Sequence, residues 1–292
     1  MKSESHLSPL FPWFGGKRWL APRIWAWLGP DVRRYIEPFA GGLAVLLARP
    51  GGRRPRFQEI ANDTYGLLAN AYRALKAEPE AVIESSQDLL HEAELHARTR
   101  HLIGVADAVA QQLEADTSWY DVQFAGWWLW CVSSHLTSAN VIKGHRSKPS
   151  SSAMGVHRRS WVEDARLIAE RIHNVKFLCG DFGRVLTSSY LDLSSGLTGV
   201  YLDPPYDQGD QAVYGKCDPV GTWVRTVQWC VDNVRTENLR IVLSGYSGCR
   251  GQADLESAGF RRFDLVGPGG FAKNGNRFRE ACWVSPGCLV ES

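Results

Sequence analysis

Apolar and polar residues alternate along most of this chain in a rhythm of strands followed by helices. Apolar runs of strand length begin near residues 34, 56, 175, 198, 240, 260 and 281. Patterns typical of helices extend from about Leu20 to Leu28, from about Leu43, and from about Tyr65 to Lys76. Strands that alternate with helices favour a doubly wound sheet. We therefore predict an α/β protein with a seven-stranded, mostly parallel sheet and helices on both faces.

This rhythm stops in the middle of the chain, between residues 77 and 174. Here the pattern favours helical stretches over Glu80–His101 and Tyr120–Ser134, followed by a polar loop rich in glycine and serine. A helical section between two sections of strands and helices is typical of an inserted domain. We expect one domain of residues 1–76 and 175–292 and an inserted, mainly helical domain of residues 77–174.

Length and composition are those of an ordinary globular protein. The chain has 292 residues, 44% of them hydrophobic, which suffices for one large domain with an insertion. It has no run of 18 apolar residues and no apolar stretch near its N-terminus, so we expect a soluble, unsecreted protein. Its seven cysteines are scattered without a metal-site pattern, so we expect reduced thiols and no metal.

The net charge of +2 is small, but basic residues gather in the middle section. Between residues 140 and 160 there is no acidic residue, and the basic residues are Lys143, Arg146, Lys148, Arg158 and Arg159. Such a cluster is typical of a surface that contacts the phosphates of a nucleic acid. A solvated loop is the alternative interpretation. Because the cluster lies in an otherwise unexplained section, we predict that it binds nucleic acid.

The strand that begins near residue 198 ends in the tetrapeptide Asp203-Pro204-Pro205-Tyr206. Two prolines in a row cannot continue a sheet, because each lacks a backbone N–H and has a fixed φ. The chain therefore leaves the strand with a carboxylate, carbonyl oxygens and an aromatic ring held close together. Ligands of open α/β sheets bind beyond the carboxyl ends of strands, so we predict chemistry here. A tight loop after a core strand is the alternative.

Two glycine turns earlier in the chain are candidates for a ligand site. Trp13 and Lys17 flank Gly15-Gly16, where N–H groups and an ammonium could bind an anion, although an ordinary surface turn is the alternative. The segment Glu37-Pro38-Phe39-Ala40-Gly41-Gly42 then joins a strand to a helix, without a phosphate fingerprint. A nucleoside without pyrophosphate fits this loop better than a dinucleotide.

Acidic residues follow two further strands. Asp63 ends the second strand, where nucleotide-binding sheets hold ribose hydroxyls, and Asp181 follows the third. Each could instead cap the helix that comes next, and the sequence leaves both roles open.

Taken in order, these motifs resemble those of the DNA adenine methylase family of bacteria, phages and restriction systems. The match covers residues 11–75 and 175–290. It includes Trp13-Phe14-Gly15-Gly16-Lys17, the loop from Glu37 to Gly42, Asn62-Asp63, Leu67, Asn70-Ala71-Tyr72, Asp181 and the Asp203 tetrapeptide. The resemblance implies a Rossmann-like class I methyltransferase fold, S-adenosylmethionine as cofactor and an inserted target-recognition domain.

The resemblance also implies roles for individual residues. Trp13 and Lys17 would lie near the methionine part of the cofactor, Asp63 at its ribose and Asp181 near its adenine amine. The cofactor site as a whole would consist of Trp13, Lys17, Glu37, Phe39, Gly41, Asp63 and Asp181. The implied partner is double-stranded DNA in the cytoplasm of a bacterial cell or phage-infected host, with no membrane and no metal. A restriction endonuclease partner is not visible in this chain.

Three positions depart from the family pattern. The family often has glycine at Leu43 and asparagine at Tyr65. Its members that read GATC carry an Asn- and Gly-rich motif where this chain has Ser138–His145. The recognition sequence therefore stays open.

The tetrapeptide suits transfer to an aromatic amine, whose lone pair is delocalised until its hydrogens are held out of plane. The Asp203 carboxylate and the Pro204 carbonyl would accept these two N–H groups and favour a tetrahedral nitrogen. Tyr206 would stack on the base, which must leave the duplex to reach a cofactor. We predict methylation of the exocyclic amine of adenine in DNA, without a metal or a covalent enzyme intermediate.

Other functions fit parts of this pattern. Transfer to the cytosine amine in DNA or to adenine in RNA is the closest alternative, although cytosine-amine enzymes more often carry serine at the Asp203 position. A DNA-binding protein that has lost catalysis is a second alternative. The presence of Asp63, Asp181 and Asp203 argues against that second alternative.

Overall fold

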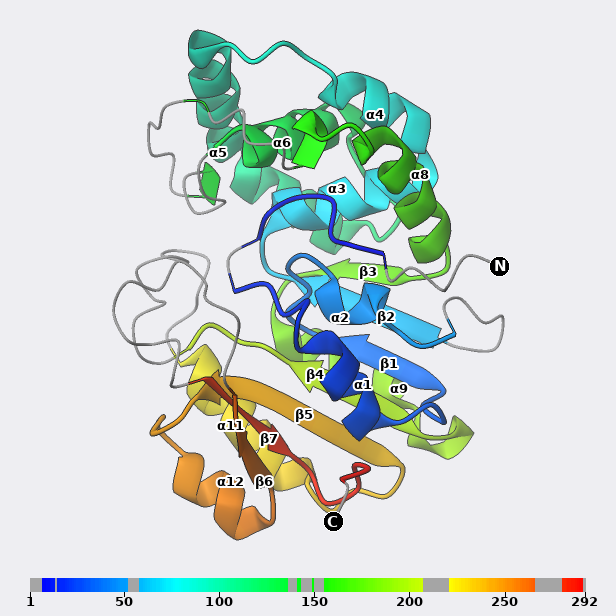
Figure 1. Ribbon diagram of the computed structural model, residues 1–292, viewed down its shortest axis with the longest axis vertical. Helices are drawn as coiled ribbons and strands as arrows, with labels where there is room; N and C mark the ends of the chain where they lie inside the picture. Colours follow the sequence, from blue (N-terminus) through cyan, green and yellow to red (C-terminus); the bar gives the residue numbers. More distant parts are fainter. Residues whose placement is uncertain are drawn as a thin grey trace.

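A seven-stranded sheet forms the centre of the molecule, with strands in the order β3-β2-β1-β4-β5-β7-β6 (Figure 1). The structure, a computed structural model, describes residues 7–13, 15–51, 58–135, 141–142, 149, 155–206, 221–265 and 280–290. The predicted α/β class and the seven predicted strands are confirmed. The strands are β1 (Arg34–Glu37), β2 (Gln58–Asp63), β3 (Lys176–Cys179), β4 (Thr198–Leu202), β5 (Leu239–Tyr246), β6 (Arg261–Asp264) and β7 (Glu280–Val284).

One strand runs against the others. The neighbours β3, β2, β1, β4 and β5 are all parallel, whereas β7 pairs antiparallel with both β5 and β6. The strand order reverses between β1 and β4, and ligands of open α/β sheets bind outside the carboxyl ends at such a point. Glu37 ends β1 and Asp203 follows β4, so both lie at this crevice.

Side chains of the strands alternate between two apolar layers, one on each face of the sheet. Tyr35 and Tyr201 belong to the layer of α1, α2 and α3. Their sequence neighbours Ile36 and Val200 belong to the layer of α9, α11 and α12. Strands buried on both faces read as continuous apolar runs, which is why the pattern predicted them. The helices beside the sheet are α1 (Ala21–Leu28), α2 (Ala44–Leu47), α3 (Gly66–Ala77), α9 (Ser188–Leu191), α11 (Thr222–Asn233) and α12 (Gln252–Ala258), with 3-10 turns η2 (Phe182–Val185) and η3 (Leu193–Ser195).

A group of helices lies between α3 and β3 in the chain, and we call the described residues between 79 and 172 the helical segment. Figure 1 shows it gathered at one end of the molecule, beyond β3. Its helices are α4 (Pro79–Ser86), α5 (Glu92–Ala115), α6 (Val122–Ser134), the 3-10 turn η1 (Gly155–His157) and α8 (Trp161–Ile172).

The helical stretch predicted from Glu80 to His101 is two helices, and the second continues to Ala115. The chain becomes extended at Gln87, directly after α4. The indole N–H of Trp130, on α6, donates a hydrogen bond of 3.1 Å to the carbonyl of Asp88 in the break. A contact between distant residues therefore holds the break, and helical periodicity cannot reveal it.

Buried polar side chains of α3 join the helical segment to the sheet. Asn70 exchanges hydrogen bonds of 2.7 and 2.8 Å with the backbone of Asp121, at the start of α6. Arg73 donates to the carbonyls of Phe177 in β3 and Leu113 in α5. One apolar layer continues from the sheet into these helices. The predicted division into a catalytic domain and a target-recognition domain stays a prediction.

No helix in the described ranges is long and apolar enough to form a membrane span. Six cysteines lie in those ranges, all buried and free, and Cys217 lies outside them. Burial raises the pKa of the Cys131 thiol to about 12, so this thiol stays protonated and packs as a small apolar group.

Candidate active site

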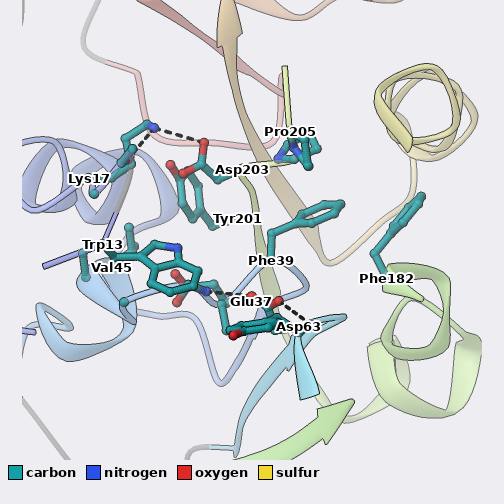
Figure 2. A pocket seen from close by; sticks show the side chains of 18 of the residues that line it. Trp13, Lys17, Glu37, Phe39, Val45, Asp63, Phe182, Tyr201, Asp203 and Pro205 are labelled. Atoms are coloured by element: carbon teal, nitrogen blue, oxygen red, sulfur yellow. Dashed lines mark hydrogen bonds and ion pairs between the residues drawn. The ribbon is translucent and has the colours of Figure 1, made fainter. Parts of the chain in front are cut away.

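A pocket opens where β1 and β4 end. Its wall is formed by the turn before α1, the loops after β1, β2, β3 and β4, and the first residue of β7. Ile142, from the middle section of the chain, also lines it. Figure 2 shows Lys17 and Asp203 at one end of the pocket and Asp63 at the other. The wall contains one lysine, Lys17, and five carboxylic residues, Glu37, Asp63, Asp181, Asp203 and Glu280.

Asp203 lies in the pocket at the position that the sequence predicted. Its Oδ1 accepts a hydrogen bond of 3.0 Å from the Tyr206 hydroxyl and lies 3.2 Å from Lys17 Nζ. Burial raises the pKa of Asp203, the Lys17 ammonium lowers it and the Glu280 carboxylate raises it, so that this pKa lies above the usual aspartate value. The whole tetrapeptide lines the pocket: Asp203, Pro204, Pro205 and Tyr206.

Lys17 is held between two carboxylates. Its Nζ lies 3.2 Å from Asp203, 3.2 Å from Glu280 Oε1, and donates a hydrogen bond of 2.8 Å to the Gly15 carbonyl. Burial lowers the pKa of Lys17, but the two carboxylates outweigh it and raise the pKa above its usual value. Lys17 is therefore a permanent positive charge. It also lies 5.3 Å from the centroid of the buried Tyr206 ring.

The glycine loop after β1 is held by the carboxylate at the end of β2. Asp63 Oδ2 accepts a hydrogen bond of 3.0 Å from the Gly41 N–H, and Oδ1 accepts one of 3.0 Å from the Tyr65 N–H. Gly41 has a φ of 44°, and a Cβ there would lie 2.7 Å from Trp13 Nε1, so this position requires glycine. Tyr65, not Asp63, is the N-cap residue of α3. Burial raises the pKa of Asp63 above its usual range.

Glu37 is buried in the floor of the pocket. Its Oε2 accepts hydrogen bonds of 3.1 Å from the Tyr35 hydroxyl and 3.2 Å from the Leu46 N–H. Burial raises the pKa of Glu37 well above its usual range, although both hydrogen bonds oppose the shift. Glu37 thus joins the end of β1 to α2.

Asp181 caps the turn that follows β3 and also lies in the pocket wall. It is the N-cap of η2, accepting a hydrogen bond of 2.9 Å from the Gly183 N–H, and it also lines the pocket. Arg225, on α11, donates to both of its oxygens at 2.7 and 2.9 Å, and this interaction holds the pKa of Asp181 below its usual range. The Arg225 guanidinium covers the Phe182 ring, which stacks on Phe39 with centroids 5.2 Å apart.

Residues 13–218 match the family model of D12 class N6 adenine-specific DNA methyltransferases. The chain belongs to this family. It is 28% identical over 213 residues to the Type II methyltransferase M1.LlaDCHI of Lactococcus lactis subsp. cremoris, and the alignment covers 70% of this chain and 68% of that protein. The predicted family and the predicted methylation of adenine in DNA are confirmed.

The D12 methyltransferase pocket brings together all the cofactor residues predicted from the sequence. These residues come from four separate segments and all line the pocket: Trp13, Lys17, Glu37, Phe39, Gly41, Asp63 and Asp181. Their individual roles stay predictions. Within the described ranges, no three His, Cys, Asp or Glu residues are grouped so that they could hold a metal ion.

The predicted DNA-contacting residues of the D12 methyltransferase are described only in part. Arg158 forms an ion pair of 2.7 Å with Asp164 of α8. Arg159 is exposed. Lys143, Arg146 and Lys148 lie outside the described residues, as does most of the segment that replaces the family's Asn- and Gly-rich motif.

The two departures from the family pattern near the glycine loop after β1 have different consequences. Leu43 has a φ of 56°, in the left-handed region that glycine adopts more readily, and its side chain is fully buried. Apolar burial therefore offsets the backbone strain. The Tyr65 hydroxyl accepts a hydrogen bond of 3.3 Å from the buried Trp128 indole, so this side chain joins the pocket wall to α6.

Among the residues of the site that the sequence did not predict are Phe182, Arg225 and Glu280. Phe182 directly follows Asp181, so its position was a usable signal. Arg225 reaches Asp181 from helix α11, 44 residues farther along the chain, and no local pattern marks it. Glu280 was missed because the strand-end rule considers residues that follow parallel strands, whereas antiparallel β7 brings its first residue to the same edge.

Proposed function

We propose that this protein transfers a methyl group from S-adenosylmethionine to the exocyclic amine of an adenine that has left duplex DNA. The observation that carries the proposal is the position of the Asp203 tetrapeptide, in a pocket with five carboxylic residues and one lysine. When bound, the cofactor supplies an electrophilic methyl group on a sulfonium sulfur.

The chemistry of the pocket fits this cofactor. Its excess of carboxylates complements a sulfonium cation, and the aromatic faces of Trp13 and Phe39 suit both a cation and an adenine ring. The close approach of Trp13 leaves no room for a side chain at Gly41, so the backbone of the loop is open to a ligand there. Asp63 would accept from the ribose, and Asp181 from the adenine amine.

At the other end, Asp203 and the Pro204 carbonyl would accept the two hydrogens of the target amine. This favours a tetrahedral nitrogen with its lone pair available for attack. The Asp203 charge also favours the positive charge that develops on the amine. The ring of Tyr206 would contact the extruded base.

The middle section of the chain supports a role in target recognition. Ile142 lines the pocket, and Lys143 follows it directly in the sequence. We propose that residues 77–174 bind DNA around the extruded adenine, with phosphate contacts from Lys143, Arg146, Lys148 and Arg159. The Type II relative supports a place in a restriction–modification system.

Sequencing of modified bases in DNA from cells that express the protein tests this proposal. We expect N6-methyladenine at one short recognition sequence, and no methylation in cells that express Asp203→Ala at the same level. Methylated cytosine amines, or methylation confined to RNA, would instead support another acceptor. Cofactor and DNA binding without methylation of either nucleic acid would indicate a silent binding protein.

A further inference from the structure

Two carboxylates share one buried ammonium at the transfer end of the pocket. Lys17 Nζ lies 3.2 Å from Asp203 Oδ1 and 3.2 Å from Glu280 Oε1, so these two oxygens lie no farther apart than twice that distance. The Lys17 side chain is 5% exposed, whereas those of Asp203 and Glu280 are 20% and 23% exposed. The group therefore has one positive and two potential negative charges at the mouth of a buried site.

The backbone holds Glu280 firmly in this position. Glu280 opposes Tyr246 in the antiparallel pair of β7 and β5, and its carbonyl accepts a hydrogen bond of 2.8 Å from the Leu265 N–H of the neighbouring chain segment. Tyr246 in turn packs against the Tyr206 ring. Glu280 thus reaches Lys17 from a strand whose register is fixed by its partners.

The other groups near Asp203 do not supply the negative charge that the Glu280 carboxylate can supply. The Tyr206 hydroxyl donates to Asp203, and burial raises the pKa of Tyr201, of Glu37 and of the Cys282 thiol, which favours their neutral forms. Without Glu280, the positive charge of Lys17 would act on Asp203 alone.

We infer that Glu280 is a positioning residue for methyl transfer: it shares the Lys17 ammonium with Asp203, so that Lys17, Asp203 and Glu280 together keep a net negative charge while Asp203 accepts the target amine. This inference rests on the proposed function. A full ion pair with Lys17 would cancel the charge that favours the developing ammonium. Glu280 acts through Lys17 and does not itself touch the amine.

The test compares Glu280→Gln with wild-type protein in the pH dependence of kcat. We expect a plateau kcat lower by about tenfold, because the acceptor is more fully neutralised. The acid limb reflects protonation of Asp203, whose pKa the Glu280 carboxylate raises. Its loss should move this limb to lower pH by roughly half a unit to one unit. The Lys17 ammonium lowers the pKa of Asp203, so Lys17→Met should move the acid limb of the kcat profile to higher pH.

A second measurement needs neither cofactor nor DNA. The buried ammonium of Lys17 gives a lysine NH₃⁺ resonance, identified by its absence in Lys17→Met, and its chemical shift senses ionisation of the neighbouring carboxylates. We expect its titration to move to lower pH in Glu280→Gln. Glu280→Asp keeps the charge and should restore the wild-type acid limb, at least in part.

Glu237→Gln, an exposed glutamate outside the pocket, is the matched control and should match wild type in both measurements. Wild-type kcat in Glu280→Gln would overturn the inference. A lower kcat with an unmoved acid limb and an unmoved Lys17 titration would also overturn it, because Glu280 would then only support the fold. Failure of the wild-type protein to methylate adenine would instead contradict the proposed function, and the Lys17 resonance would still test how its charge is shared.

Discussion

The carboxyl ends of the parallel strands and the joint between the sheet and the helical segment both bury charged groups, but the two regions compensate them differently. At the strand ends, burial raises the pKa values of Glu37, Asp63 and Asp203, and all three face one pocket. At the joint, the Arg73 guanidinium donates to four backbone carbonyls, and Arg171 forms two hydrogen bonds of 2.6 and 2.8 Å to a glutamate.

This difference distinguishes the arginines at the joint, which stabilise the fold, from the carboxylates at the strand ends, which we expect to bind a ligand. A buried charge surrounded by its partners stabilises one arrangement of the chain, and its loss is a loss of stability. A buried carboxylate with a raised pKa at a pocket surface lacks part of its stabilisation until a ligand supplies it. Substitutions in the two regions should therefore affect different measurements.

The largest effect is expected at Asp203. Replacement by asparagine should lower kcat about 10³-fold, or about 4 kcal/mol, because an amide cannot favour a developing positive charge. Cofactor affinity should stay within a few-fold, and the free energy of unfolding should not fall, since burial of this carboxylate is costly. Asp264→Asn, an exposed aspartate at the end of β6, should leave kcat unchanged. Near-normal turnover of Asp203→Asn at saturating DNA and cofactor would refute the assigned role.

The next effect concerns the joint. Arg171, in α8, pairs with Glu59 of β2 and donates to the Leu46 carbonyl at 2.8 Å. Arg171→Met should lower the free energy of unfolding by about 3 kcal/mol, because it leaves a buried carboxylate with one partner fewer. Urea unfolding measures the loss. Arg166→Met, on the same helix but in an exposed pair with Glu80, should leave the free energy of unfolding nearly unchanged. If the two variants lost the same free energy of unfolding, the expected difference between a buried and an exposed arginine would be wrong.

A smaller effect is expected at Asp63, which faces the pocket and also holds the backbone of the glycine loop. Asp63→Ala should weaken cofactor binding by about 1–3 kcal/mol, through loss of a charge-assisted hydrogen bond and of the bond to Gly41. Calorimetry of the folded variant measures this. Because the pKa of Asp63 is raised, wild-type affinity should also fall as pH drops through that raised pKa, and the variant should not follow this trend. Unchanged affinity in the variant would limit Asp63 to holding the loop.

The comparison also explains which parts the sequence could predict. Strands, and the acids that follow them, are local patterns, so β4 with Asp203 and β2 with Asp63 were found at the correct positions. Glu280 depends on the direction of β7, which only the pairing of distant strands sets. Arg73 looks like an ordinary helix residue in the sequence, because the carbonyls that it binds come from other segments. The sequence thus predicted the carboxylates at the strand ends, but not the distant residues that position them or stabilise the fold.

The smallest effect is expected where the helical segment would meet DNA. Arg159 is exposed, whereas its neighbour Arg158 is paired with Asp164, so the two arginines form a matched pair. Each phosphate contact releases condensed counterions. Arg159→Ala should therefore make the negative slope of log affinity against log salt shallower by about 1, on specific and random duplexes alike. Arg158→Ala should leave the slope unchanged, because its charge is already compensated within the protein. An unchanged slope for Arg159→Ala would mean that this residue is part of a solvated surface. If both variants had the same slope, shallower than that of wild type, the ion pair between Arg158 and Asp164 would open when DNA binds.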